Sequence, residues 1–424
     1  MTPTAALIER LVPAGAIHDG DTSALDWLST RGLPDPREEA WRYTPVAEVV
    51  SSLQAAVPAT QQLVERNVVD ALAGDHGGPR IVIVNGVYAP ALSDLDRLRP
   101  GLWCGRLADL SPTQDAAPRW RDAALLVDGF QALNHIAGAD GAAVLIDAGA
   151  QPPDPVHIVH VTSPGERAAV SHPRTVIDAG ESSQVHVIET FCGLPGAAFT
   201  NASATLRIGR GADVTHHRIQ AEAAATIHIG HTRVDQAAES RLHASSVMFG
   251  ADIARHAIEV VLHGPDASVD LDGLYLPTGH QRHDTTVTVD HAASRCSSTQ
   301  RFKGVVGDHA RGSFSGRITV RSGTVATDAS QSNANLLLCP TAQADTRPWL
   351  EIFADDVRCT HGATVGRLDD DALFYLRSRG IPLEESRSML IDAFVREITD
   401  AITPTSLRDH LTASFDAIAS GASS

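Results

Sequence analysis

The densest group of potentially reactive side chains is the segment Asp355-Asp-Val-Arg-Cys359-Thr-His361-Gly, which contains two carboxylates, a thiol and an imidazole. In an extended strand alternate side chains share a face, so Cys359 and His361 would point the same way. A thiolate beside an imidazole suits iron or another soft-to-borderline metal. Two ligands do not complete a four-coordinate site, so the missing ligands would have to come from elsewhere.

Three other interpretations of the reactive residues stay open. A buried cysteine is commonly just a small apolar side chain, which is the structural interpretation of Cys359. A thiol beside a base also suits a cysteine hydrolase, but no oxyanion hole or orienting third group is visible here. The acid clusters Asp270-Leu-Asp272 and Asp369-Asp-Asp371 would suit a β-helix lyase or hydrolase acting on carbohydrate. The 4% aromatic content, low for stacking on sugars, argues against that enzyme.

Histidine is abundant, and 15 of the 20 histidines lie between His157 and His309. Two pairs stand three residues apart, in Val156-His-Ile-Val-His and Ile227-His-Ile-Gly-His. Residues at an odd separation in a strand face opposite sides, so neither pair can easily share one metal ion. We therefore expect these histidines to be polar residues on a solvated sheet face.

The elements that would position these residues fall into three predicted regions. Residues 1–78 look helical and form an N-terminal cap region. From Ile81-Val-Ile-Val onward, residues 79–364 read as short strands without a convincing long helix between them. Residues 365–424 return to a helical pattern. The chain should therefore be mainly β, with helices at both ends.

A small residue in a turn before a strand recurs through the strand region, with separations of 29, 26, 29 and 27 residues. The positions are Ser183, Ala212, Ala238, Ala267 and Ser294. Such a near-period predicts a solenoid of stacked coils. A β-sandwich is the alternative, but its strands usually recur at roughly 8–12 residues without a longer period.

The C-terminal region predicts three short amphipathic helices. In the second, Leu390, Phe394 and Ile398 keep a four-residue spacing and so share one face. Faces of this kind pack within a bundle or dock a partner. As residues for partner docking we take Phe374 and Tyr375 of the first helix, with Leu390 and Phe394.

Composition limits the possible partners and location. The net charge of -17, from 34 basic and 51 acidic residues, disfavours nucleic acid and anionic membranes. The N-terminus lacks a secretory leader pattern and no apolar run could span a bilayer, so we expect a cytoplasmic protein. The five cysteines include no CxxC pair. The sole lysine, Lys303, follows no glycine-rich loop, so any nucleotide hydrolysis would belong to another subunit.

Several segments resemble the SufB/SufD family of the SUF iron–sulfur cluster assembly system. They are Asn335-Leu-Leu-Leu, Ala344-Asp-Thr-Arg-Pro-Trp-Leu-Glu-Ile with its continuation through Cys359 and His361, and Leu373-Phe-Tyr-Leu-Arg-Ser-Arg-Gly-Ile. Near the N-terminus, Glu39-Ala-Trp-Arg-Tyr-Thr44 matches a motif typical of SufD members. The SufB branch carries a cysteine just after a glutamine, where this chain has Gln331-Ser-Asn. The resemblance therefore favours the SufD branch.

The resemblance implies a right-handed parallel β-helix flanked by helices, and a scaffold rather than an enzyme. It also implies two partners, a SufB-like subunit and a SufC-like ABC ATPase docked on the C-terminal helices. His361 would lie at the interface with the SufB-like subunit and help to build the nascent cluster, with Cys359 beside it. We expect no tightly bound cofactor on the isolated chain, only transient iron or cluster in the complex. A flavin in the complex and a homodimer of the isolated chain stay undecided.

Overall fold

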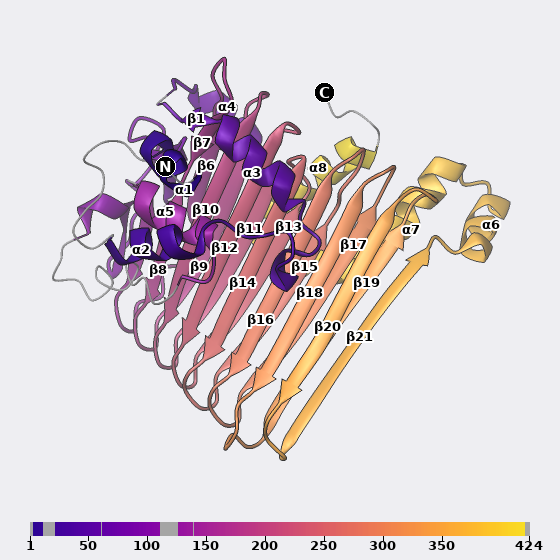
Figure 1. The fold of residues 1–424 in the computed structure, drawn as a ribbon. Helices are drawn as coiled ribbons and strands as arrows, with labels where there is room; N and C mark the ends of the chain where they lie inside the picture. The colour runs from indigo at the N-terminus through magenta and orange to yellow at the C-terminus, as the bar shows by residue number, and fades with distance from the viewer. Residues whose placement is uncertain (1–2, 12–21, 61, 111–125, 139, 420–424) are drawn as a thin grey trace.

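Two long β-sheets lie face to face and form a solenoid (Figure 1). The computed structural model describes residues 3–11, 22–60, 62–110, 126–138 and 140–419. Sheet A has 11 strands and sheet B has 10. From β8 onward, consecutive strands alternate between the two sheets and pair in parallel with the strand one coil away. The predicted mainly β fold, with a β-helix core and helices at both ends, is confirmed.

The strands up to β8 are short, and those from β9 onward are longer. Sheet A contains β4 (Leu102–Arg106), β5 (Ala142–Ile146), β8 (Arg174–Ala179), β10 (Ala198–Ile208), β12 (Thr226–Gln236), β14 (Ile253–Leu262), β16 (Arg282–His291), β18 (Arg311–Val320) and β20 (Gln343–Ile352), with β1 (Val57–Pro58) and β7 (Ala169–Ser171) beside them. Sheet B contains β2 (Arg80–Val84), β3 (Val87–Tyr88), β6 (Val156–Thr162), β9 (Gln184–Gly193), β11 (Asp213–Ala221), β13 (Arg241–Met248), β15 (Ser268–Tyr275), β17 (Ser297–Val306), β19 (Thr327–Leu337) and β21 (Val357–Arg367).

The repeat is real, but its phase differs from the prediction at two positions. In register, Asp213 pairs with Gln184 on one side and with Arg241 on the other. The residue before each strand is therefore Ser183, Ala212, Ser240, Ala267 and Cys296, all buried. Ala238 and Ser294 each lie two residues too early. Small side chains recur here because the chain turns sharply against the coil below, which leaves little room.

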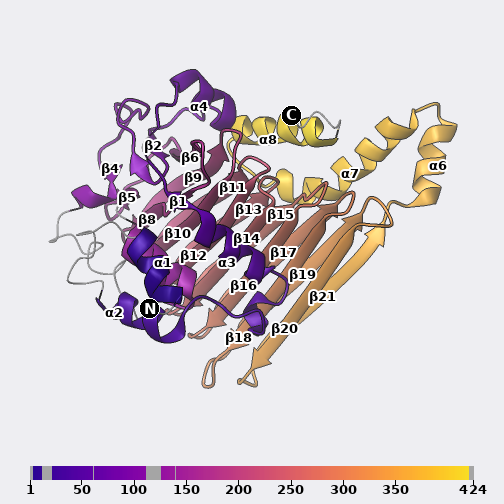
Figure 2. The same cartoon turned by 45° about the horizontal axis from the view of Figure 1, so that its top comes forward.

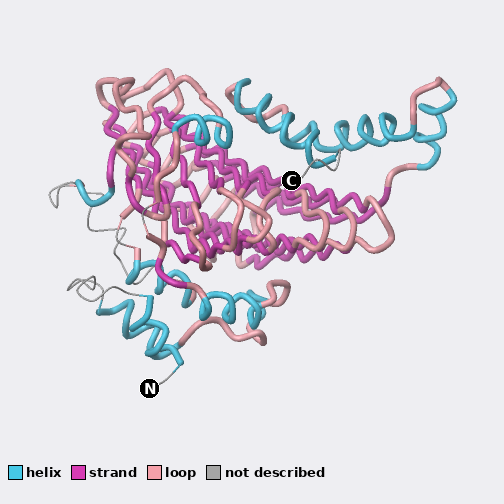
Figure 3. Tube along the Cα trace, turned by 90° about the horizontal axis from the view of Figure 1, so that it is seen from above, coloured by secondary structure: helices cyan, strands magenta, loops and turns pink. Residues whose placement is uncertain are grey.

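Helices cover the outer faces of both sheets (Figure 3). Sheet A carries α1 (Pro3–Leu11), α2 (Thr22–Arg31), η2 (Glu39–Trp41), α3 (Val46–Ala55) and α5 (Gly129–Ala137), which share a core with Phe199 and Ile229. Sheet B carries α4 (Arg66–Ala73), α7 (Leu383–Thr399) and α8 (Thr405–Ala419). The short η3 (Leu107–Asp109) follows β4. α5 lies inside the region predicted to be strands alone, and the predicted boundaries after residues 78 and 364 stay predictions.

The last coil and its helix are the least covered part of the fold. α6 (Asp370–Ser378) has no buried residue and projects away from the solenoid beyond β21 (Figure 2). Within the described ranges, no helix is both long enough and apolar enough to cross a bilayer.

The Glu39–Thr44 motif fastens the N-terminal cap to sheet A. Trp41 is buried, and the Arg255 guanidinium lies 4.2 Å from the centre of its ring. Arg255 forms an ion pair with Asp284 and donates a hydrogen bond to the Ala40 carbonyl (2.9 Å). The Thr44 hydroxyl donates to Asp284 (2.5 Å). Ala40, Trp41 and Thr44 therefore have a structural role, because they attach the N-terminal cap to β14 and β16.

Candidate metal-ligand site at the open end of the solenoid

The solenoid has an open end formed by β20 and β21. In the described part of the chain, β20 pairs with β18 alone and β21 pairs with β19 alone, so both present an unpaired edge. Large apolar side chains are exposed near these edges: Ile352 (39%), Phe353 (64%) and Val365 (47%). An unpaired, apolar edge of this length is a template for pairing with another strand.

Cys359 and His361 lie on β21 and face the same way, as predicted. Their register partners on β19 are Ala329 and Gln331, whose side chains point into the solenoid and are buried. Because paired residues of neighbouring strands share a face, Cys359 and His361 extend these interior columns to the open end. His361 is exposed, whereas Cys359 is half-buried.

Cys359 packs against an apolar cluster that includes Ile318 and Ala329. Burial and the nearby Asp328 carboxylate raise the pKa of its thiol, so the protonated thiol is the resting form. In the ranges that the structure describes, no group of three or more histidine, cysteine or acidic side chains could hold a metal ion. Among the described residues nothing completes the pair, and the roles of Cys359 and His361 as ligands stay predictions.

A closed ring of hydrogen bonds lies in the interior one coil below β21. The Tyr275 hydroxyl donates to Asn335 Oδ1 (2.5 Å), Asn335 Nδ2 donates to Asn333 Oδ1 (2.7 Å), and Asn333 Nδ2 donates to the Tyr275 oxygen (3.1 Å). All three side chains are buried. A fully satisfied polar network rigidifies its surroundings. This ring therefore keeps the interior of β19 rigid beneath the open end.

The expectation that the histidines lie on a solvated face is wrong. Ten of the 15 between His157 and His309 are buried: His157, His160, His172, His216, His217, His228, His231, His256, His283 and His291. They are tolerated because neighbouring coils supply hydrogen-bond partners, which residue spacing along one strand does not reveal. As predicted from strand geometry, the paired histidines contact different groups: His157 contacts Thr190, whereas His160 contacts Glu189.

Two buried carboxylates organise the interior histidines. Burial favours the neutral acid, but hydrogen bonds from His160 and His216 lower the pKa of Glu189 well below its usual value. Burial likewise opposes ionisation of Glu222, yet the adjacent His228 lowers the pKa of Glu222 to about 2. Arg218 donates to His228 Nε2 (2.5 Å), so the His228 proton sits on Nδ1, which donates to Glu222 (2.6 Å).

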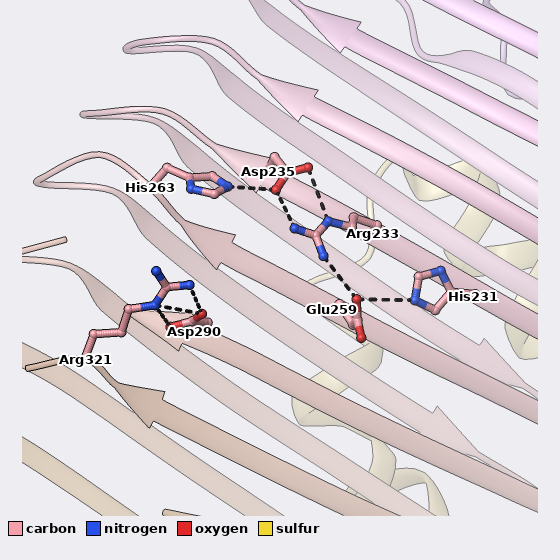
Figure 4. A network of polar contacts seen from close by, with 7 residues as sticks. All are labelled: His231, Arg233, Asp235, Glu259, His263, Asp290 and Arg321. Atoms are coloured by element: carbon pink, nitrogen blue, oxygen red, sulfur yellow. Dashed lines mark hydrogen bonds and ion pairs between the residues drawn. The ribbon is translucent and has the colours of Figure 1, made fainter. Parts of the chain in front are cut away.

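Charged side chains on the outer face of sheet A pair both along one strand and between coils. Figure 4 shows Arg233 of β12 between Asp235 (3.0 Å) and Glu259 of β14 (3.3 Å). His231 approaches Glu259 (3.6 Å), and His263 contacts Asp235 (2.8 Å). His231 is buried, His263 is exposed and the other side chains are half-buried, and ion pairs that keep contact with solvent typically contribute little to stability.

The acid clusters cited for carbohydrate chemistry have structural partners. Asp270 contacts His243 (3.1 Å), and Asp272 contacts the Arg301 guanidinium (2.7 Å). Asp369 caps α6 by accepting hydrogen bonds from the Asp371 and Ala372 amides (2.9 and 3.3 Å). Asp270, Asp272 and Asp369 therefore have structural contacts, while Asp370 and Asp371 lie in the first turn of α6.

The four predicted docking residues lie in two different settings. Phe374 and Tyr375 on α6 are 74% and 57% exposed. Leu390 and Phe394 on α7 are half-buried, and Phe394 packs against the core shared with sheet B. The Lys303 ammonium lies 4.9 Å from the Phe394 ring centre and donates to the Phe394 carbonyl (2.7 Å). Exposure therefore leaves α6 available for a partner, whereas Phe394 attaches α7 to the solenoid.

The fold and the site define a parallel β-solenoid with an unpaired end, where Cys359 and His361 lie on one face of β21. A family model described as "SUF system FeS cluster assembly, SufBD core domain" matches residues 160–394. The chain belongs to the SufB/SufD family, is of the SufD type, and has a role in iron–sulfur cluster assembly.

Individual relatives agree with this membership. The chain is 32% identical over 392 residues to the "Iron-sulfur cluster assembly protein SufD" of Escherichia coli, covering 92% of this chain and 90% of the relative. It is 30% identical over 412 residues to an "Iron-sulfur cluster assembly SufBD family protein" of Synechocystis, covering 92% and 88%. It is 27% identical over 274 residues to the SufD protein of Bacillus subtilis, covering 63% and 62%.

Proposed function

We propose that this chain is a non-catalytic scaffold subunit that pairs, through the open end of its solenoid, with a related SufB-like subunit. The observation that carries the proposal is the pair of unpaired edges on β20 and β21, beside exposed Phe353 and Val365. A second solenoid with a matching open end would continue both sheets and cover these side chains. The partner would also complete the ligand set.

Within that pairing, His361 contributes an imidazole to iron or to the nascent cluster, which are cargo of the assembly. Its exposure at the open end and its position beside Cys359 support this role. Cys359 is the weaker ligand, because burial raises the pKa of its thiol. No tightly bound cofactor belongs to the isolated chain, and the complex works in the cytoplasm.

The C-terminal helices bind a separate subunit, a SufC-like ABC ATPase. Phe374 and Tyr375 supply exposed aromatic area on a helix without buried residues. Aromatic side chains of this kind commonly dominate binding energy at protein interfaces. α7 then links this contact to sheet B through Phe394.

The test is co-purification of the tagged chain with its two partners, followed by anaerobic cluster reconstitution read by visible absorption. His361→Ala should leave the complex assembled and lower the yield of cluster. His309→Ala is the matched control, because His309 is also exposed but lies in a turn between β17 and β18. Undiminished cluster formation by His361→Ala would remove the ligand role, and failure to bind either partner would remove the scaffold role.

A further inference from the structure

Gln331 lies directly behind His361 in the interior of the solenoid. The two residues are register partners on β19 and β21, and Gln331 is 3% exposed. Strands in a sheet lie about 4.8 Å apart and paired side chains share a face, so an imidazole on β21 reaches the end of this glutamine. Among the described residues, His361 has no hydrogen-bond partner.

The Gln331 amide is held from the other side. Its Nε2 donates to Gln300 Oε1 (2.7 Å), and Gln300 is the register partner of Gln331 on β17. A Cβ atom added at Gly316 of β18 would come within 2.1 Å of Gln331 Nε2. The Gln331 amide can occupy this position because Gly316 has no side chain.

The opposite atom of the same amide is buried and unsatisfied. Gln331 Oε1 accepts no hydrogen bond from any described residue. A buried carbonyl oxygen without a partner costs free energy, and in native proteins such an atom usually has a donor or a function. Two register partners of Gln331 carry a donor without a hydrogen bond to any described residue, Gln300 through its Nε2 and His361 through its ring N–H. Because Gln331 Nε2 already faces Gln300, its Oε1 is left for the other side, where His361 lies.

We propose that Gln331 is a positioning residue for His361. When the exposed His361 ring turns towards β19, Gln331 Oε1 accepts the N–H of one ring nitrogen, which fixes one tautomer and directs the lone pair of the other nitrogen out of the open end. Ligating histidines are commonly held in this way by an acceptor behind the ring. The proposal rests on the proposed function for its purpose, since the oriented lone pair would meet iron or cluster, but the hydrogen bond itself does not depend on that function.

The first experiment measures the hydrogen bond in the intact chain without partners. The ring nitrogens of selectively ¹⁵N-labelled histidine are recorded by NMR at pH 8, above the ordinary titration range of imidazole. The His361 signals are assigned by their loss in His361→Ala. Gln331→Leu removes the acceptor while keeping similar volume, and should change the His361 tautomer ratio about five- to tenfold.

Two further variants separate positioning from general damage. Gln331→Glu keeps an acceptor oxygen and should preserve the native tautomer. Gly316→Ala leaves Gln331 in place but displaces its amide, and should shift the ratio as Gln331→Leu does. An unchanged His361 spectrum in Gln331→Leu or in Gly316→Ala, with the fold intact by circular dichroism, would overturn the proposal.

The second experiment asks what the orientation does in the assembled complex. Titration with Fe²⁺ under anaerobic conditions should show an affinity about 10-fold lower for Gln331→Leu and near native for Gln331→Glu. Equal affinity in all three proteins, together with a shifted tautomer in Gln331→Leu, would leave the hydrogen bond standing and reject the iron-binding function of His361. The two failures are thus distinguishable.

Discussion

Arg255 and Asp284 form an ion pair beneath the N-terminal cap, with side chains that are 4% and 6% exposed. The pair joins β14 to β16, and the cap reaches it through Trp41 and Thr44. Removing one member of a buried pair leaves the other charge uncompensated, which typically costs about 3–5 kcal/mol.

We therefore expect Asp284→Ala to lower the free energy of unfolding by about 3 kcal/mol or more in urea titrations. The control is Asp290→Ala, which removes the more exposed pair with Arg321 (2.6 Å) shown in Figure 4. That change should cost about 0–1 kcal/mol. Equal losses in the two variants would show that the cap does not depend on the buried pair.

The contrast between α6 and α7 gives a second prediction. Phe374→Ala should weaken binding of the ATPase without lowering the melting temperature, because its ring is 74% exposed. Phe394→Ala should lower stability by roughly 2 kcal/mol, since its ring is half-buried against sheet B. Phe353→Ala, another exposed phenylalanine, should change neither property when the ATPase is the sole partner present.

A melting temperature that falls in Phe374→Ala would place its ring in the core of the isolated chain. Unchanged ATPase binding, measured by surface plasmon resonance, would instead move the docking surface away from α6.

The buried histidines predict acid sensitivity. Burial lowers the pKa of His283 to about 4 from the ordinary value of 6.5. Between these values the unfolded chain binds a proton that the folded chain does not, so stability falls as the pH drops from about 6.5 to 4. This one residue contributes roughly 3 kcal/mol of that loss. Glu222, with its pKa lowered to about 2, adds a further loss below about 4.5, as its carboxylate becomes protonated.

His283→Gln keeps a donor toward the Gly250 carbonyl and removes the titration. Its stability should therefore fall less steeply between pH 6.5 and 4 in urea unfolding, whereas exposed His309→Gln should retain the native slope. A native slope in His283→Gln would mean that this histidine is protonated in the folded chain.

The solenoid was predictable because its small residues recur just before strands, but the phase was not. The residue before each small residue has a positive φ: Ser182 (56°), Gly211 (63°), Glu239 (61°), Asp266 (63°) and Arg295 (59°). Serine, glutamate and arginine do not mark a left-handed turn in sequence as glycine does. The left-handed turns at Glu239 and Arg295 therefore have no sequence signal. They come directly before Ser240 and Cys296, the two repeats in which the predicted position is two residues early.

The candidate site was likewise predictable only in part. The shared face of Cys359 and His361 follows from strand alternation and was predicted. The partners of buried groups come from neighbouring coils, as Glu189 meets His160 29 residues away, and no local pattern announces them. For the same reason, no local sequence pattern connects Gln331, one coil behind His361, with the site. The signal that could identify Gln331 is its separation from His361, which equals the length of about one coil and so makes the two residues register partners.

The open end gives the last prediction. Val365 on β21 is 47% exposed beside an unpaired edge, so a lysine there would place a charge where a partner strand should pack. Val365→Lys should weaken association with the SufB-like subunit at least 10-fold, because burying an unpaired ammonium group is costly. Val325→Lys is the matched control, since Val325 is 48% exposed in the loop between β18 and β19, one coil below the unpaired strands. Sedimentation of each variant with the partner measures the effect. If a homodimer of the isolated chain uses the same edge, Val365→Lys should also convert it to monomer. Equal association by both lysine variants would show that pairing uses another surface.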